Sequence, residues 1–99
     1  MKMSKTCKRL NEKLLLVLSK INEEAKPIIG FSHLTHTVQF DNFPSSLLVN
    51  CHFIEEEHLK IAHTNDIEGK LQKQLHKQLL KKGIVLKTPK MNLVLTGPI

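Results

Sequence analysis

Residues 33–54 read HLTHTVQFDNFPSSLLVNCHFI, and this stretch predicts a β-hairpin. The segments 33–40 and 47–54 both alternate with period two, which is typical of strands that bury one face. The residues between them, DNFPSS, favour a turn around Phe43 and Pro44. The expected cross-strand pairs are Phe40 with Leu47, Val38 with Val49, His36 with Cys51 and Leu34 with Phe53. Each pair joins two residues of the core face, so the alternation and the register support one another.

The segment before the hairpin has the period of an amphipathic helix. Residues 4–25 place apolar side chains on one arc. Pro27 ends the helix, because proline has no amide proton and disfavours helical geometry in the residue before it. Leu15 and Leu16 lie off the apolar arc, so we expect this helix to be covered on more than one side.

A second long helix is expected over residues 66–82, where leucines recur one turn apart. Asn65 suits the N-cap, with Glu68 three residues on in a capping-box relation. Gly83 suits a left-handed C-cap. Before this helix, consecutive glutamates favour the start of a short helix over residues 55–63.

Two further segments, 84–86 and 91–96, look like strands and are interrupted at Thr88 and Pro89. They form either one bent strand or two. The resulting order is helix, strand, strand, helix, strand. It predicts an α+β two-layer sandwich, in which two helices pack on one face of a small three- or four-stranded sheet. The 99 residues are expected to form a single domain, 1–99.

This order of elements is similar to that of type-II KH domains and of the ribosome-binding factor A family. The resemblance lies in the order of helices and strands and extends over most of the chain. The GxxG loop with which KH domains clamp a nucleic-acid backbone is absent from the sequence. Layout alone assigns no function.

The cysteine content and the lengths of the apolar runs indicate the cellular compartment. The two cysteines, Cys7 and Cys51, form no CxxC motif and are too few for a disulfide framework, which favours free thiols in a reducing compartment. The apolar run at 14–18 is too short for a signal peptide or a membrane span. We therefore expect a cytoplasmic protein without a membrane partner, and no motif calls for a cofactor.

Charge is the most informative feature for function. The net charge is +6, and it is distributed as +4 over residues 1–30, −4 over 31–66 and +6 over 67–99. Within the last third, four lysines follow one another at spacings of three and four residues, which places them on one helix face. We call these residues the lysine ladder: Lys70, Lys73, Lys77 and Lys81.

Two interpretations of the lysine ladder are open. Lysines bind phosphates as point charges, and Arg9, Lys13 and Lys20 would reinforce the ladder if the two long helices lie side by side. Alternatively, the ladder is a solvated face, because lysine is a good helix former. The absence of any acid between residues 70 and 82 favours phosphate binding. A single arginine and the lack of Trp and Tyr weigh against it, since few side chains can stack on bases.

Other chemistry is weakly indicated. Six histidines show no metal-binding spacing, so no metal site is expected. His36 opposite Cys51 would be the one pairing of a base with a nucleophile, but both residues point toward the core, where a thiol is inert. His33 and His52 are expected to be neighbours on the outer face of the sheet, diagonally placed with Thr35.

The sequence also offers surfaces for a protein partner. Phe43 stands at the hairpin tip, where it either anchors a partner or folds back over the core. Ile54 lies on the outer face of the sheet, which two helices on the other face would leave uncovered.

The leading hypothesis is therefore a non-enzymatic, RNA-associated accessory module that contacts phosphates through its lysine-rich helix faces. The alternative is a protein-interaction or self-associating module that uses the hairpin tip and the outer sheet face, with another protein or a second copy as the partner.

Overall fold

The computed structural model describes residues 5–97, with side chains from Cys7 onward. The expected helix start at Ser4 lies outside this range. The helices and strands follow in the order α1 (Lys5–Ala25), β1 (Phe31–Thr37), β2 (Leu48–Phe53), α2 (Glu56–Thr64), α3 (Ile67–Lys81) and β3 (Leu93–Thr96). Two single 3₁₀ turns, η1 (Phe40–Asn42) and η2 (Pro89–Met91), lie in the connections.

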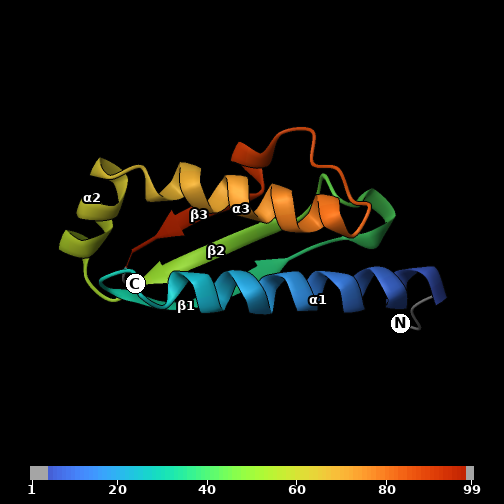
Figure 1. The fold of residues 1–99 in the computed structure, drawn as a ribbon, viewed down its shortest axis with the longest axis horizontal. Helices are drawn as coiled ribbons and strands as arrows, with labels where there is room; N and C mark the ends of the chain where they lie inside the picture. Colours follow the sequence, from blue (N-terminus) through green and yellow to red (C-terminus); the bar gives the residue numbers. More distant parts are fainter. Residues whose placement is uncertain (1–4, 98–99) are drawn as a thin grey trace.

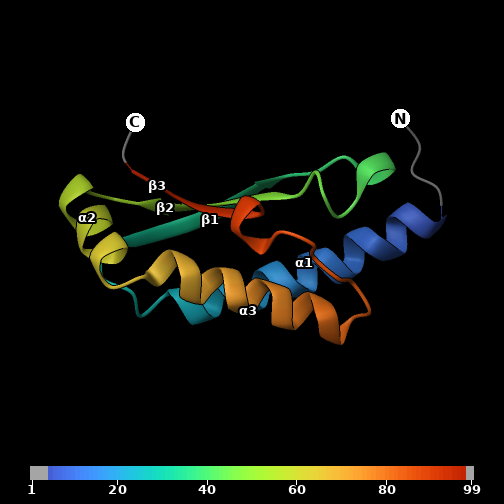
Figure 2. The ribbon, with the colours of Figure 1, turned by 90° about the horizontal axis from the view of Figure 1, so that it is seen from above.

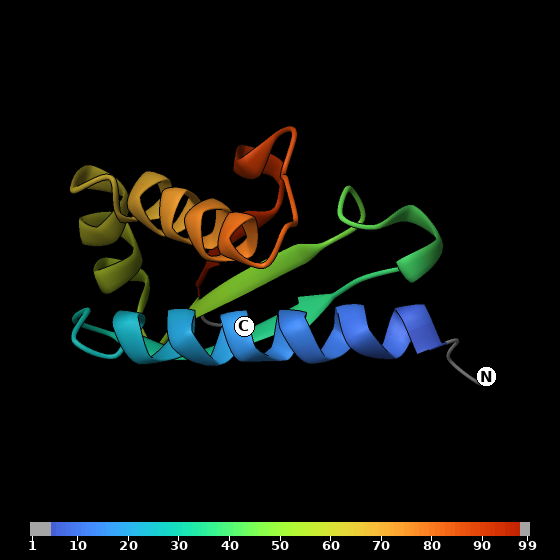
Figure 3. The ribbon, with the colours of Figure 1, turned by 45° about the vertical axis from the view of Figure 1, so that its right-hand side comes forward.

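The molecule has two layers, as predicted for an α+β sandwich (Figure 1). Figure 2 shows α1 and α3 on one side of the sheet, with α2 at one end and none of the described helices over the other side. The two long helices run side by side, with α1 along β1 (Figure 3), and α3 packs against β3. The strand order is β1-β2-β3, in which β1 and β2 are antiparallel and β3 is parallel to β2.

The hairpin has the predicted faces but not the predicted register. Leu34 lies opposite Cys51 and His36 opposite Val49, a shift of two residues, and Phe40 and Leu47 lie outside the strands, so none of the expected pairs forms. The shift accompanies a longer connection than predicted: β1 ends at Thr37, and Phe40, expected in the strand, starts η1. A register error of two keeps each side chain on its face, since side chains alternate with period two.

The core lies between the helix layer and the inner face of the sheet. Its largest fully buried side chains come from α1, from β2 and the residue before it, from α3 and from β3, with leucine the most frequent type: Leu14, Ile21, Leu47, Val49, Cys51, Leu75, Leu79 and Leu93. Leu15 and Leu16 are not part of it and expose 48% and 62% of their surface. The expectation that α1 is covered on more than one side is therefore not met within the described chain.

The boundaries of α3 correct two further predictions. Asn65 is the C-cap of α2, and Asp66 precedes α3 in the left-handed region with φ 53°, so the predicted capping box is wrong. Glu68 instead accepts a hydrogen bond from the Leu95 amide at 3.2 Å. At the other end, Gly83 has the predicted left-handed conformation, with φ 81°.

The connection from α3 to β3 has little regular structure. Residues 84–86 form no strand, although Ile84 and Leu86 are buried. Their alternation reflects packing against the core without a partner strand. The final strand begins at Leu93, so the predicted strand at 91–96 is confirmed in its last four residues.

Candidate nucleic-acid interface

The lysine ladder lies on the exposed side of α3. All four of its side chains are exposed, while Leu71, Leu75 and Leu79 of the same helix are buried. From Lys70 to Lys81 the helix rises about 16 Å. The ladder is thus a straight row of ammonium groups on the outer surface of the helix layer.

Within residues 7–97, no carboxylate pairs with a ladder lysine. The one ion pair in this part of the chain joins Lys26 to Glu23, with 2.8 Å between Nζ and Oε1. Glu68, the only acid in α3, is directed toward β3 by its bond to Leu95. No ladder lysine is therefore held in an ion pair within the described residues, although Glu24 lines a hollow together with Lys70.

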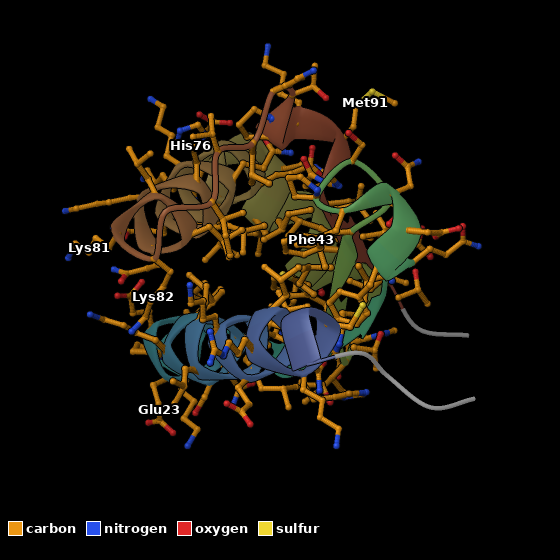
Figure 4. The ribbon with its side chains drawn as sticks, turned by 90° about the vertical axis from the view of Figure 1, so that its right-hand side faces the viewer. Glu23, Phe43, His76, Lys81, Lys82 and Met91 are labelled. Carbon is orange, nitrogen blue, oxygen red and sulfur yellow. The ribbon has the colours of Figure 1, made fainter. Side chains whose placement is uncertain are left out.

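Cationic side chains of α1 continue this surface. Lys20 lines a shallow hollow between α1 and α3 together with Lys81 and Lys82. Arg9 and Lys13 are exposed, and their helical spacing places them on the same flank of α1 as Lys20. Figure 4 shows Lys81 and Lys82 on the helix side of the molecule, away from the sheet. The structure thus brings both predicted sets of cations onto the helix layer.

A larger groove opens on the other flank of α3, between this helix and η2. Its volume is about 800 Å³. Lys73 and Lys77 line one wall, and Lys90 lies on the η2 side. Leu80 and Pro89 supply apolar surface, and Asp66 and Glu68 lie at one end. His76 also lines the groove, and Figure 4 shows it on the outer surface near this side of α3.

A buried amide holds the two walls of the groove together. Gln72 is 6% exposed, and its Nε2 donates to the carbonyl oxygens of Leu93 at 2.9 Å and Lys90 at 3.3 Å. Sequence reasoning missed Lys90, His76 and Gln72. No local pattern reveals them, because their proximity depends on the path of residues 83–92 back along α3.

The histidine and cysteine predictions have mixed outcomes. Cys51 is fully buried, and burial, with a smaller contribution from the Glu68 charge, raises the pKa of its thiol to about 12. His36 lies diagonal to Cys51 and opposite Val49, so the predicted base–nucleophile pair is not formed. A protonated thiol in the core is a poor nucleophile.

On the outer face of the sheet, His33 pairs directly with His52. Their rings stack with centroids 4.6 Å apart, and Thr35 Oγ1 lies 2.7 Å from His52 Nε2. Within the described residues, no group of three or more possible metal ligands occurs.

The two residues predicted for a protein partner differ in exposure. Phe43 is half-buried and packs against Phe40, with ring centroids 5.6 Å apart. Figure 4 shows it toward the interior of the molecule. It therefore folds back over the end of the core, one of the two expected arrangements. Ile54 is 62% exposed.

Comparison with known proteins adds no family. No protein family matches the chain, and neither a curated protein nor a solved structure is similar enough to count as a match. Among the described residues, no helix has the length and apolar character that crossing a membrane requires.

Proposed function

We propose that this protein binds the phosphate backbone of nucleic acid, in particular RNA, along α3. The observation that supports this most is the exposed lysine ladder, whose four ammonium groups form no ion pair within the described chain. A row of unpaired lysines attracts a polyanion and gains affinity from the release of counterions. Lys20 on α1 and Lys90 on η2 widen the basic surface on either flank.

The groove beside α3 favours RNA with unpaired nucleotides over a regular duplex. An unpaired base can enter a groove with apolar surface at Leu80 and Pro89, while Lys73 and Lys77 hold the adjacent phosphates. The bases of a duplex are paired and stacked, so a duplex can contact only the outer row of lysines.

The test is fluorescence anisotropy of a labelled RNA stem-loop at about 50 mM and about 200 mM salt, with duplex DNA for comparison. If the lysine ladder contacts four phosphates, affinity falls about 50- to 150-fold over this salt range. Binding that is absent at about 50 mM salt would contradict the proposal.

A pair of charge-matched variants separates a defined site from general attraction. Replacing Lys73, Lys77 and Lys81 with Gln removes three charges from the ladder. Replacing Lys8, Lys26 and Lys60 with Gln removes three exposed charges elsewhere. The ladder variant is expected to lower the slope of log affinity against log salt by about 2 to 3, and the control by much less. Equal losses would mean that only the net charge matters.

A protein-interaction function is the second candidate, and the exposed outer face of the sheet favours it. Ile54 stands at the end of β2, and the outward residues of β1 and β2 carry no lysine, arginine or carboxylate: His33, Thr35, Thr37, Leu48, Asn50 and His52. Ile54→Asp is expected to abolish association with a protein partner and to leave RNA binding unchanged. Loss of RNA binding in this variant would argue against two separate surfaces.

A further inference from the structure

The two edges of the sheet differ in their protection. The β3 edge is covered by side chains of α3: the Leu93 carbonyl accepts from Gln72, and the Leu95 amide donates to Glu68. Within residues 5–97, the β1 edge has no neighbouring strand, since β1 pairs with β2 alone. Exposed edge strands are commonly protected by lysine, proline, a β-bulge or a covering segment. The seven residues of β1, FSHLTHT, contain neither lysine nor proline, and the register shift between Phe31 and His33 leaves the pairing of residues 33–37 with β2 regular.

The hydrogen-bonding pattern identifies the peptide groups that face this open edge. The Val49 amide donates to the carbonyl oxygen of Asn92, the residue before β3, so it points toward β3. The Ile54 amide donates to the carbonyl oxygen of Gly30, the residue before β1, so it points toward β1. Peptide groups of alternate residues point to opposite sides of a strand, so Leu48, Asn50 and His52 face β1. Their partners there are Thr37, Thr35 and His33. The peptide groups of Leu34 and His36 therefore point away from the sheet.

The apolar side chain of Leu15 lies on the same side of the molecule as the open β1 edge. Leu16 and Lys20 of α1 line the hollow shared with α3, which identifies the α3-facing flank of this helix. Leu15 is one residue away from Leu16, about 100° around the axis, on the flank that faces away from α3. Because α1 lies over β1 and α3 over β3, that flank is next to the open edge. Leu15 is 48% exposed.

We propose that two copies of this chain join through their β1 edges, antiparallel and across a two-fold axis, to form a continuous six-stranded sheet. The outward peptide groups of Leu34 and His36 would bond to those of the second copy, and the two Leu15 side chains would meet between the α1 helices. An identical strand supplies donors and acceptors in the matching order, as an isologous interface requires. The strand itself carries no lysine, arginine or carboxylate, so no like charges meet between the two paired strands. This inference is independent of the proposed function.

The first test is the mass in solution, measured by sedimentation at about 10 µM to about 500 µM protein. The expected result is a shift from 11.3 kDa to twice that mass as concentration rises. Leu15→Lys is expected to raise the dissociation constant about tenfold or more, because the change occurs on both sides of the interface. Leu16→Lys is the matched control, since Leu16 is even more exposed but lies on the α3 side; it should leave dimerisation unchanged. A chain that stays monomeric throughout would overturn the proposal.

A second pair of variants tests the backbone bonds. His36→Pro removes the amide proton that points away from the sheet and leaves the hydrogen bonds to β2 in place. His36→Val keeps that amide proton. Only the proline variant should therefore lose the dimer. Amide hydrogen exchange in the unaltered chain provides a reading that does not depend on either variant folding. Protection of the Leu34 and His36 amides should rise with concentration, whereas Thr35 should be protected at every concentration. A dimer without this protection, or one that survives both Leu15→Lys and His36→Pro, uses another surface and refutes the inference.

Discussion

Replacing Gln72 with Met should destabilise the fold and loosen the groove at the same time. Methionine has a similar length and keeps the packing, but it removes both hydrogen bonds of the amide. The Leu93 carbonyl faces away from β2 and is buried, so it loses its partner without gaining water. The Lys90 carbonyl is only partly buried and can be hydrated in part.

The expected magnitude follows from these two carbonyl groups. An unsatisfied buried acceptor costs about 1–3 kcal/mol, and the partly hydrated one costs less, for a total of about 2 kcal/mol. In a domain of this size that corresponds to a fall in Tm of about 8–16 °C. Because the same bonds hold η2 against α3, Lys90 would no longer be fixed opposite Lys73 and Lys77. Affinity for RNA should therefore fall at temperatures where the variant is still folded.

Thermal unfolding followed by circular dichroism measures the first effect, and anisotropy at about 20 °C below the Tm of the variant measures the second. Gln74→Met is the control, because Gln74 is on the same helix but half-exposed, beside Lys70. It should change the stability by less than about 0.5 kcal/mol. If Gln72→Met unfolds within about 2 °C of the unaltered protein, Gln72 does not hold the groove together.

Three further predictions concern the fold. Gly30→Ala should cost more stability in urea unfolding than Gly83→Ala: both glycines have positive φ, but a Cβ at Gly30 would overlap the His58 side chain, whereas Gly83 has open space around it. Equal costs would show that His58 moves freely. Leu75→Ala should cost about 2–5 kcal/mol, because Leu75 is fully buried and its removal leaves a cavity; a cost under about 1 kcal/mol would contradict the packing described. The raised pKa of Cys51, about 12 against 9.0, means that above pH 9 the unfolded chain releases its thiol proton while the folded chain keeps it. Stability should therefore fall between about pH 9 and pH 12 more steeply than in Cys51→Ala, and parallel curves would refute the assigned burial.

The sequence predicted what depends on local periodicity. The alternation of the hairpin assigned each side chain to the correct face, and the helical period placed the lysine ladder opposite the buried leucines. The register failed by two residues because it depended on where the turn begins, and the η1 turn takes up Phe40. The capping box failed because Asn65 ends α2 and α3 begins one residue later than predicted, while Glu68 bonds to the Leu95 amide on the β3 edge, which the local sequence does not reveal.

The groove was beyond sequence reasoning for a related reason. Lys90 is distant from Lys73 and Lys77 in sequence, and it faces them because residues 83–92 turn back along α3. That path is fixed by buried side chains at Ile84 and Leu86 and by the Gln72 bonds, none of which follows a recognisable motif. Residues 83–92 have little regular structure, so their sequence has no helical or strand periodicity. A site that such a segment assembles cannot be predicted from periodicity.

The two proposals occupy different sides of the molecule, and together they predict a dependence on RNA length. Pairing through β1 would place both helix layers on the same face of the six-stranded sheet, in the order α3, α1, α1, α3. With about 8–10 Å between neighbouring helices, the two lysine ladders would lie about 24–30 Å apart and face the same way. A single long RNA could then contact both, which raises its apparent affinity, whereas a short one could contact only one. Leu15→Lys should therefore weaken the binding of a strand of about 24 nucleotides and leave that of about 6 nucleotides unchanged. Leu16→Lys adds a cation beside Lys20 and Lys81 and should therefore weaken neither. An equal loss for both lengths in Leu15→Lys would mean that this residue belongs to the RNA interface and not to a dimer.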